Sequence, residues 1–309
     1  MIERRAFLAT LAGSLLVAPL ATCAQQPERV IRIGYLSSSL ASNPLGHRAF
    51  LRGLGDLGYV EGRNVVIEYR DALGRLERLP ALAAELVALK VDVIVAASGT
   101  LPAMAAVRAS QAVPVVFIAV GDPITSGLAK SLARPGGHAT GLSALSADLS
   151  GKWMELLGEA VPGVRRVGVL WQPGGMGERT ERDVLNEMVA AARTMGMQVR
   201  LVEARGPADF DRAFTEIGKA RVGALTVVST PMFGSERLRI VDFAARNRLP
   251  TIYGYRSYVD DGGLISYGPH LEDLSRRAAS YVDRIVKGAR PGDLPVEQPT
   301  RFELVINLR

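Results

Sequence analysis

The chain has 309 residues, 48% hydrophobic and 22% charged, a composition that suits a soluble protein with two α/β domains. The 37 basic and 31 acidic residues give a formal net charge of +6, but they are interleaved, which argues against a nucleic-acid partner. The single cysteine, Cys23, excludes an internal disulfide, and three separated histidines (His47, His138 and His270) form no metal-ligand pattern. We therefore expect no bound metal.

Residues 1–24 have the pattern of an export signal. Arg4 and Arg5 form a positive start, an apolar stretch runs from Phe7 to Leu20, and small residues precede the polar Gln25. The stretch is too short for a comfortable membrane span. The arginine pair followed by apolar residues resembles a twin-arginine signal. We therefore predict a protein exported to the periplasm.

Two endings of this signal remain open. Cleavage after Ala24 leaves Gln25 as the first mature residue, whereas Leu20-Ala21-Thr22-Cys23 resembles a lipobox in which Cys23 would carry a lipid. A threonine before the cysteine departs from the usual Gly or Ala, which favours the soluble form over the lipoprotein. Cys23 is a catalytic thiol in neither case.

From residue 30 the pattern alternates between strands and helices. Short apolar runs predict strands at Ile31–Leu36, Val65–Tyr69, Asp92–Ala97 and Val115–Ala119. The continuous apolar run at 92–97 is typical of a sheet that is covered on both faces. Capping residues, Pro positions and leucine spacing predict helices at Pro44–Leu57, at Leu76–Leu89, from Ser98 onward and from Asp122-Pro123 onward.

The alternation restarts after Pro162. We predict strands at Arg166–Trp171, Gln198–Glu203, Ala224–Ser229 and Phe302–Ile306. The predicted helices of this half are Glu178–Met195, Asp209–Ala220, Glu236–Asn247 and Leu271–Lys287. Two successive sets of this kind imply an α/β fold with two Rossmann-like lobes, each with a parallel sheet, joined by a hinge.

The same pattern suggests where the lobes begin and end. We expect an N-terminal lobe of residues 30–145 plus about 266–290, and a C-terminal lobe of residues 146–265 plus about 291–309. Residues 146–163 are the expected first crossing between them.

One glycine pattern matches a nucleotide-binding motif only in its letters. Residues 53–58 read GLGDLG, but they end a predicted helix, whereas dinucleotide binding needs these glycines between a strand and the start of a helix. A helix-ending role for Gly58 is sufficient. The sequence contains no GxxxxGK[ST], HExxH or GxSxG motif, and an enzyme would have to rely on isolated carboxylates such as Asp122, Asp260 or Asp261. We therefore predict no cofactor, no catalytic residue and no enzymatic activity.

Ligands of open parallel sheets bind beyond the carboxyl ends of the strands, against helix N-termini. Four loops have that position: 37–39, 98–100, 120–122 and 230–232. Hydroxyls and free amides at 98–100 suit a carboxylate or another anionic group, and Trp171 would offer a flat face to a planar ligand. The candidate ligand-binding residues are therefore Ser37, Ser38, Ser98, Gly99, Thr100, Val120, Asp122, Trp171, Gln172, Thr230, Met232 and Tyr253.

Structural roles remain open for several of these residues. Ser98 or Thr100 can simply cap its helix, and Asp122 before a proline is more typical of a cap than of an amine partner. Trp171 can equally be a half-buried packing residue. Four tyrosines gather near the expected hinge, and we expect at least half of them to be structural: Tyr253, Tyr255, Tyr258 and Tyr267.

Three longer stretches carry a family resemblance. Residues 113–141 contain VPVVF, GDP and ARPGGHATG, residues 262–269 read GGLISYGP, and residues 294–307 read LPVEQPTRFELVIN. These resemble hallmarks of an ABC transporter substrate-binding family, often called TrpX-like or tryptophan/tyrosine-binding proteins. His138 stands where that family usually has Asn, a change that a turn tolerates.

The resemblance implies a type I periplasmic-binding fold whose lobes close on a ligand. It further implies an extracytoplasmic binding protein that works with an ABC permease of the inner membrane and captures an amino acid, aromatic or otherwise, or a related carboxylate. We expect the protein to be a monomer. The alternative is a sensing module that passes ligand binding to a signalling receptor. A repressor's effector domain is disfavoured, because the sequence has an export signal and no DNA-binding helix pair before residue 30.

Overall fold

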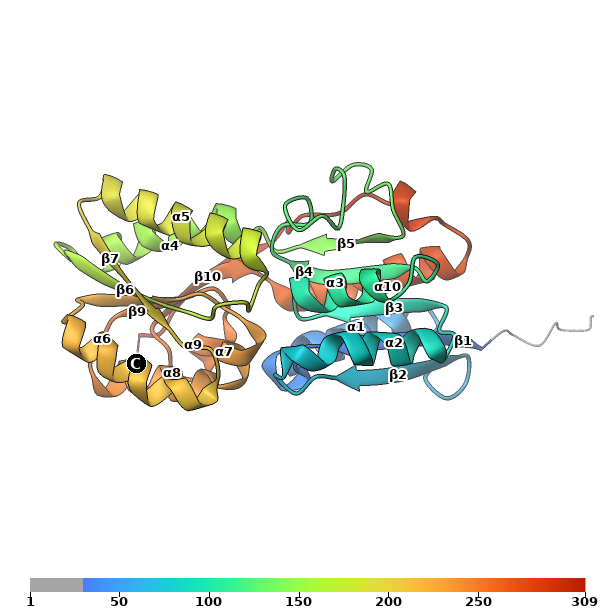
Figure 1. Cartoon of the computed structure of the whole chain (residues 1–309), viewed down its shortest axis with the longest axis horizontal. Coiled ribbons are helices and arrows are strands. Elements are labelled where there is room, and N and C mark those ends of the chain that lie inside the picture. Colours follow the sequence, from blue (N-terminus) through green and yellow to red (C-terminus); the bar gives the residue numbers. More distant parts are fainter. Residues whose placement is uncertain (1–29, 309) are drawn as a thin grey trace, which may run out of the picture. The chain divides into compact units, whose positions relative to one another are not determined.

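The computed structural model describes residues 30–308. The predicted export signal, with Arg4, Arg5 and Cys23, lies outside the described residues. Residues 31–308 contain two separate β-sheets, each covered by helices on both faces (Figure 1). An α/β fold with two lobes, predicted from the alternation of strands and helices, is confirmed.

The sheet of the first lobe has five parallel strands in the order β2-β1-β3-β4-β5. They are β1 Ile31–Ser37, β2 Val65–Asp71, β3 Val93–Ala97, β4 Val115–Val120 and β5 Ala139–Ser143. The helices of this lobe are α1 Pro44–Asp56, α2 Leu79–Ala88, α3 Thr100–Ala109 and α10 Leu271–Val286. Short 3-10 turns occur at η1 Leu40–Ser42, η2 Leu76–Arg78 and η4 Pro291–Asp293.

Side chains alternate between the two faces of this sheet. Val93 and Val95 of β3 pack against α1 and α10, whereas Ile94 and Ala96 pack against α2 and α3. Because both faces are covered, the whole of β3 is apolar and buried. Gly53 brings α1 and α10 together, since a Cβ there would lie 2.6 Å from the carbonyl oxygen of Arg276. The GLGDLG pattern thus contains a packing glycine and, at Gly58, a turn residue with φ +87°.

The sheet of the second lobe has six strands in the order β11-β10-β9-β8-β6-β7, and only β11 runs antiparallel to its neighbour. The strands are β6 Arg166–Trp171, β7 Gln198–Glu203, β8 Ala224–Val227, β9 Thr251–Tyr253, β10 Ile265–Pro269 and β11 Phe302–Ile306. One face packs against α4 Ser146–Ala160 and α5 Glu178–Thr194. The other packs against α6 Phe210–Ala220, α7 Pro231–Ser235, α8 Arg237–Arg246 and α9 Ser257–Asp260. The 3-10 turn η3 Pro207–Asp209 directly precedes α6.

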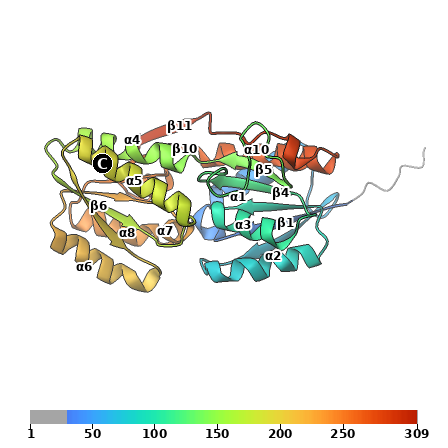
Figure 2. The same cartoon turned by 45° about the horizontal axis from the view of Figure 1, so that its top comes forward.

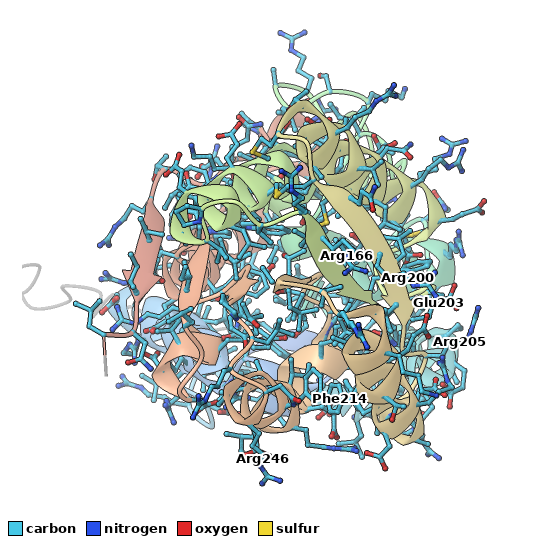
Figure 3. All side chains as sticks on the ribbon, turned by 90° about the vertical axis from the view of Figure 1, so that its left-hand side faces the viewer. Arg166, Arg200, Glu203, Arg205, Phe214 and Arg246 are labelled. Carbon is cyan, nitrogen blue, oxygen red and sulfur yellow. The ribbon has the colours of Figure 1, made fainter. Side chains whose placement is uncertain are left out.

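Charged side chains line the exposed edge strand β7 (Figure 3). Arg200 pairs with Glu216 of α6 at 2.6 Å, and Arg205, just beyond the strand, pairs with Glu203 at 3.0 Å. Exposed ion pairs of this kind contribute little stability, but charge on an edge strand discourages pairing with another chain.

Three chain segments connect the lobes. They run from β5 to α4 at residues 143–146, from β10 to α10 at residues 269–271, and from residue 297 to β11, the last being the red segment at the top of Figure 2. The first and third meet, because the Ser143 amide donates to the Glu297 carbonyl at 2.9 Å and the Glu297 amide donates to the Gly141 carbonyl at 3.0 Å. Leu145 in the first connection has φ +53°, a strained value for a leucine.

Some sequence-based expectations about these elements are wrong. The helix predicted from Asp122-Pro123 is absent: residues 123–127 form turns, in which the Asp122 carboxylate accepts from the Ile124 and Thr125 amides at 2.8 and 3.0 Å. Residues 146–160, expected as a crossing, form helix α4. The strand β5 was not predicted, since its sequence ATGLS is neither alternating nor strongly apolar.

The strand pairing also assigns two segments to a different lobe from the one we expected. Most of β10, at 265–269, was placed with the first lobe, but it pairs with β9 and β11 of the second sheet. Residues 291–298 were placed with the second lobe, but Leu294 accepts a hydrogen bond from the Thr140 hydroxyl of β5 at 2.7 Å. No helix in the described part of the chain is both long enough and apolar enough to span a membrane.

Candidate functional site

A pocket lies between the carboxyl ends of the first-lobe strands and the facing loops of the second lobe. It encloses about 890 Å³ of empty space, including the part that is open to solvent. Its first-lobe lining is Tyr35, Leu40, Ser42, Asn43, Ala97, Ser98, Gly99, Thr100, Ile118, Ala119, Gly121, Leu271 and Ser275. Its second-lobe lining is Ser146, Gly175, Met176, Ser229, Thr230, Pro231, Gly234, Tyr255, Ser257 and Tyr258.

The turn from β3 into α3 forms one wall of the pocket. Ser98 and Gly99 both have positive φ, +70° and +104°, and Gly99 is the N-cap of α3. No side chain caps this helix, so the capping role left open for Ser98 or Thr100 is wrong. Instead, Ser98 Oγ lies 3.3 Å from Ser37 Oγ, and Thr100 Oγ1 accepts a hydrogen bond from the Gly121 amide at 3.3 Å. Of the amides at the start of α3, that of Gly99 donates to the Ile118 carbonyl at 3.3 Å and Pro102 has none, so those of Thr100 and Leu101 are left without an intrahelical acceptor.

An irregularity in β4 shapes the adjacent wall. The pairing with β5 shifts between Ile118 and Val120, and Ala119 between them has φ +60°. The shift exposes Ala119 to the pocket and turns Val120 into the core, where it is completely buried. Strained residues of this kind are concentrated at functional sites.

Hydroxyl groups of the second lobe face these walls. Thr230 caps the short helix α7, since its Oγ1 accepts from the Phe233 amide at 3.3 Å. Tyr258 OH and Ser229 Oγ are buried and make no hydrogen bond of normal geometry with any described residue. Burial raises the pKa of Tyr258, and Tyr253 and Tyr255 raise it further; Arg237 and the neighbouring Ser229 hydroxyl oppose the shift.

Three tyrosines supply the aromatic surface of the pocket: Tyr35, Tyr255 and Tyr258. Tyr35 is held from behind by Phe50 and His47, with ring centroids 5.5 and 5.1 Å away. Burial raises the pKa of Tyr35, and burial raises that of Tyr255 to about 12. Both phenols are therefore neutral over the physiological pH range.

The lobes touch at the rim of the pocket. Ser39 Oγ lies 2.9 Å from Ser235 Oγ of α7, and a Cβ on Gly234 would lie 3.1 Å from Cβ of Ser42. Near the first interlobe connection, a Cβ on Gly121 would lie 2.9 Å from Cγ2 of Thr180 in α5. The structure is therefore that of a state in which the lobes have closed around the pocket.

The pocket brings together four of the twelve candidate residues: Ser98, Gly99, Thr100 and Thr230. Two more lie directly behind its lining. Ser37 contacts Ser98, and the Tyr253 ring stacks on Tyr258 with centroids 4.6 Å apart.

The other six candidates lie outside the lining: Ser38, Val120, Asp122, Trp171, Gln172 and Met232. Trp171 packs against the core of the second lobe, and Met232 is buried in it. Gln172 donates to the Arg205 carbonyl at 3.4 Å, and Asp122 accepts from the Thr125 hydroxyl at 2.6 Å. These residues lie at or after strand ends, as predicted, but none of them belongs to the lining of the pocket.

Sequence reasoning missed much of the second-lobe wall. Ser229 ends the predicted strand 224–229 and could have been found by the strand-end rule, as could Tyr255, which follows β9. Tyr35 within β1 and Ser275 within α10 lie inside regular elements, and no local pattern marks them. No group of three or more His, Cys, Asp or Glu side chains among residues 30–308 is arranged to hold a metal ion.

Comparisons with known proteins identify the family to which this chain is related. Residues 45–309 match the family model described as ABC transporter substrate binding protein. A "Tyrosine-binding protein" of Clostridioides difficile is 28% identical over 261 residues, which cover 84% of this chain and 73% of that protein.

Two solved structures are also similar over most of their length. One is a conserved domain protein of Vibrio cholerae, with 28% identity, a TM-score of 0.83, and 91% and 93% of the two chains covered. The other is an ABC domain of Streptococcus pneumoniae in complex with L-Trp, with 25% identity, a TM-score of 0.80, and 90% and 92% covered.

Proposed function

Because this chain belongs to the family of ABC transporter substrate-binding proteins, we propose that it captures a small organic solute between its lobes and delivers it to a membrane permease. The observation that carries the proposal is the pocket, which is lined by both lobes and enclosed by contacts between them. The family is a class of binding proteins without catalysis, and the pocket accordingly combines hydroxyls and tyrosines rather than an acid–base pair.

Closure of the lobes would couple binding to delivery. A ligand favours the closed state only by its extra affinity for that state, so it must contact both lobes at once. Thr100 on the first lobe and Ser229 and Tyr258 on the second face the same space and would provide such bridging contacts. The permease would then recognise the closed surface.

The relatives indicate a class of ligand. One is named for tyrosine and another was solved with L-Trp, and the pocket has three tyrosine rings for a planar apolar group. We therefore propose an aromatic amino acid or a related carboxylate as the ligand. We further propose that residues 1–24 direct export to the periplasm and that the mature protein acts as a monomer.

A binding screen tests this function. Purified protein, freed of bound solutes by extensive dialysis, is heated with a panel of amino acids, carboxylates, sugars and polyols. We expect a rise in melting temperature with a small group of chemically related solutes, because a ligand that binds only the folded state stabilises it. If no solute shifts the melting temperature and mass spectrometry finds no small molecule released from freshly purified protein, the proposal is wrong.

A further inference from the structure

The pocket between the lobes contains many hydrogen-bonding groups and no charge. Every side chain that lines it, among the described residues, is uncharged. Its polar side chains are Ser42, Asn43, Ser98, Thr100, Ser146, Ser229, Thr230, Ser257, Ser275 and three tyrosines.

Three carboxylates that hydrogen-bond to the lining or adjoin it in the chain are engaged with protein groups. Glu181, 8% exposed, accepts from the amides of Gly174 and Met176 at 3.0 and 2.8 Å. Asp122 accepts from the Thr125 hydroxyl at 2.6 Å and from two amides. Asp71 accepts from two further amides, at 3.2 and 3.0 Å. These groups hold the loops of the pocket in place and are not presented to a ligand.

This arrangement is unfavourable for an α-ammonium group. An ammonium taken out of water requires a negatively charged partner to offset its lost hydration, and an unpaired buried charge is strongly destabilising. Hydroxyl and carbonyl oxygens can accept its hydrogen bonds, but they supply no opposite charge. An amino acid would therefore bury its ammonium beside no negatively charged side chain of the lining, with only its own carboxylate as an opposite charge.

The same pocket suits a carboxylate. The start of α3 presents the amides of Thr100 and Leu101 and the positive end of the helix dipole. Thr100 Oγ1 already accepts from the Gly121 amide, which leaves its own hydrogen free to donate. Across the pocket, Tyr258 is 1% exposed and its hydroxyl, like that of Ser229, lacks a hydrogen bond of normal geometry with any described residue. Thr100 on the first lobe and the neighbouring Tyr258 and Ser229 hydroxyls on the second thus each leave at least one donor for an anion.

We propose that this pocket selects an organic carboxylate that carries no cationic nitrogen, and that it discriminates against the corresponding α-amino acid. The inference rests on the proposed solute-binding function and narrows its substrate class. The tyrosine rings would receive the apolar body of the ligand, and the start of α3 would receive its carboxylate.

Matched ligands that differ only in charge test the proposal. Isothermal titration compares L-tyrosine with 3-(4-hydroxyphenyl)propanoate, which lacks the ammonium, with tyramine, which lacks the carboxylate, and with 3-(4-hydroxyphenyl)propanamide, which lacks both charges. The same set is built on the indole ring and on the leucine side chain. We expect the deaminated acid of at least one set to bind more than tenfold more tightly than the other three members.

The remaining outcomes separate this inference from the function on which it rests. If an amino acid, amine or amide binds as tightly as the deaminated acid, the ligand class is wrong while the binding function stands. If no set binds, the solute released from freshly purified protein decides: a carboxylate without a cationic nitrogen supports the proposal, and any other solute overturns it. If no solute is bound or released at all, the binding function itself fails, and this inference fails with it.

Discussion

The hydroxyl oxygens of Ser39 and Ser235 lie 2.9 Å apart, although the two residues are 196 positions apart in the chain and belong to different lobes. Ser39 follows β1 of the first lobe, and Ser235 ends α7 of the second. Contacts of this type exist only while the lobes are closed. They therefore stabilise the closed state and in this way increase the affinity for a ligand that binds between the lobes.

Replacing Ser39 by alanine removes this hydrogen bond. Because a neutral hydrogen bond contributes about 0.5–1.5 kcal/mol, we expect ligand affinity to fall by about two- to tenfold. Isothermal titration measures the change. Ser280→Ala, at an exposed serine of α10, is the control and should leave the affinity unchanged. Equal affinity of Ser39→Ala and the wild type would show that this bond does not stabilise the closed state.

Gly234 is expected to be required for full closure. Its Cβ would lie 3.1 Å from Cβ of Ser42, so the larger side chain of Gly234→Val would hold the lobes apart. We expect at least a tenfold loss of affinity and a larger radius of gyration in small-angle X-ray scattering with saturating ligand. Gly218→Val places the same side chain on α6, where nothing lies within 4 Å, and should close normally. A Gly234→Val protein that compacts like this control would contradict the prediction.

Thr100 links the two main walls of the pocket. In Thr100→Val the Gly121 amide loses its acceptor, and an unsatisfied buried donor costs about 1–3 kcal/mol. We expect weaker ligand binding together with a lower melting temperature, and recovery of both in Thr100→Ser, which keeps the hydroxyl. If valine and serine behave alike in titration and thermal unfolding, the hydroxyl has no role.

Glu181 is expected to position the loop that carries Gly175 and Met176. Glu181→Gln keeps the shape of the side chain but leaves one of two amides, of Gly174 or Met176, facing an NH2 group instead of an oxygen. A hydrogen bond to a charged group contributes about 1.5–3 kcal/mol. Because this bond also stabilises the free protein, only part of that energy affects binding, and we expect affinity to fall by about three- to tenfold. Glu178→Gln, at a residue whose side chain is 92% exposed, is the matched control and should not change binding.

Stability should fall steeply at alkaline pH. Burial raises the pKa of Tyr69 and of Tyr255 to about 12, and burial followed by the hydrogen bond to Asp283 does the same for Tyr59. A phenol of the unfolded chain ionises near pH 10, so the stability contributed by these groups is complete below pH 10 and is lost as the pH rises to about 12.

Two spectroscopic signals recorded together test this pH dependence. We expect the phenolate absorbance near 295 nm to rise together with the loss of far-ultraviolet circular dichroism. Ionisation of all tyrosines near pH 10 with the helices intact would contradict the raised pKa values.

Hydrophobic patterning determined the class of fold and most of its elements. The strands predicted at 166–171, 198–203 and 302–306 have those bounds in the structure, because short apolar or alternating segments between turns favour a strand over a helix. Strand β5 escaped prediction, since its pairing with β4 depends on tertiary contacts and not on its own residues.

The sequence also indicated that groups facing the pocket follow the strand ends, and Ser98, Gly99, Thr100 and Thr230 do line it. Only the tertiary structure decided which strand-end residues face the space between the lobes. Trp171 packs against the core of the second lobe and Met232 is buried in it, whereas Tyr35 and Ser275, from inside a strand and a helix, reach the pocket. The physical reason is that the pocket is formed by two lobes that meet across a hinge. Whether a side chain faces that space depends on how both lobes pack, and no local sequence pattern encodes this.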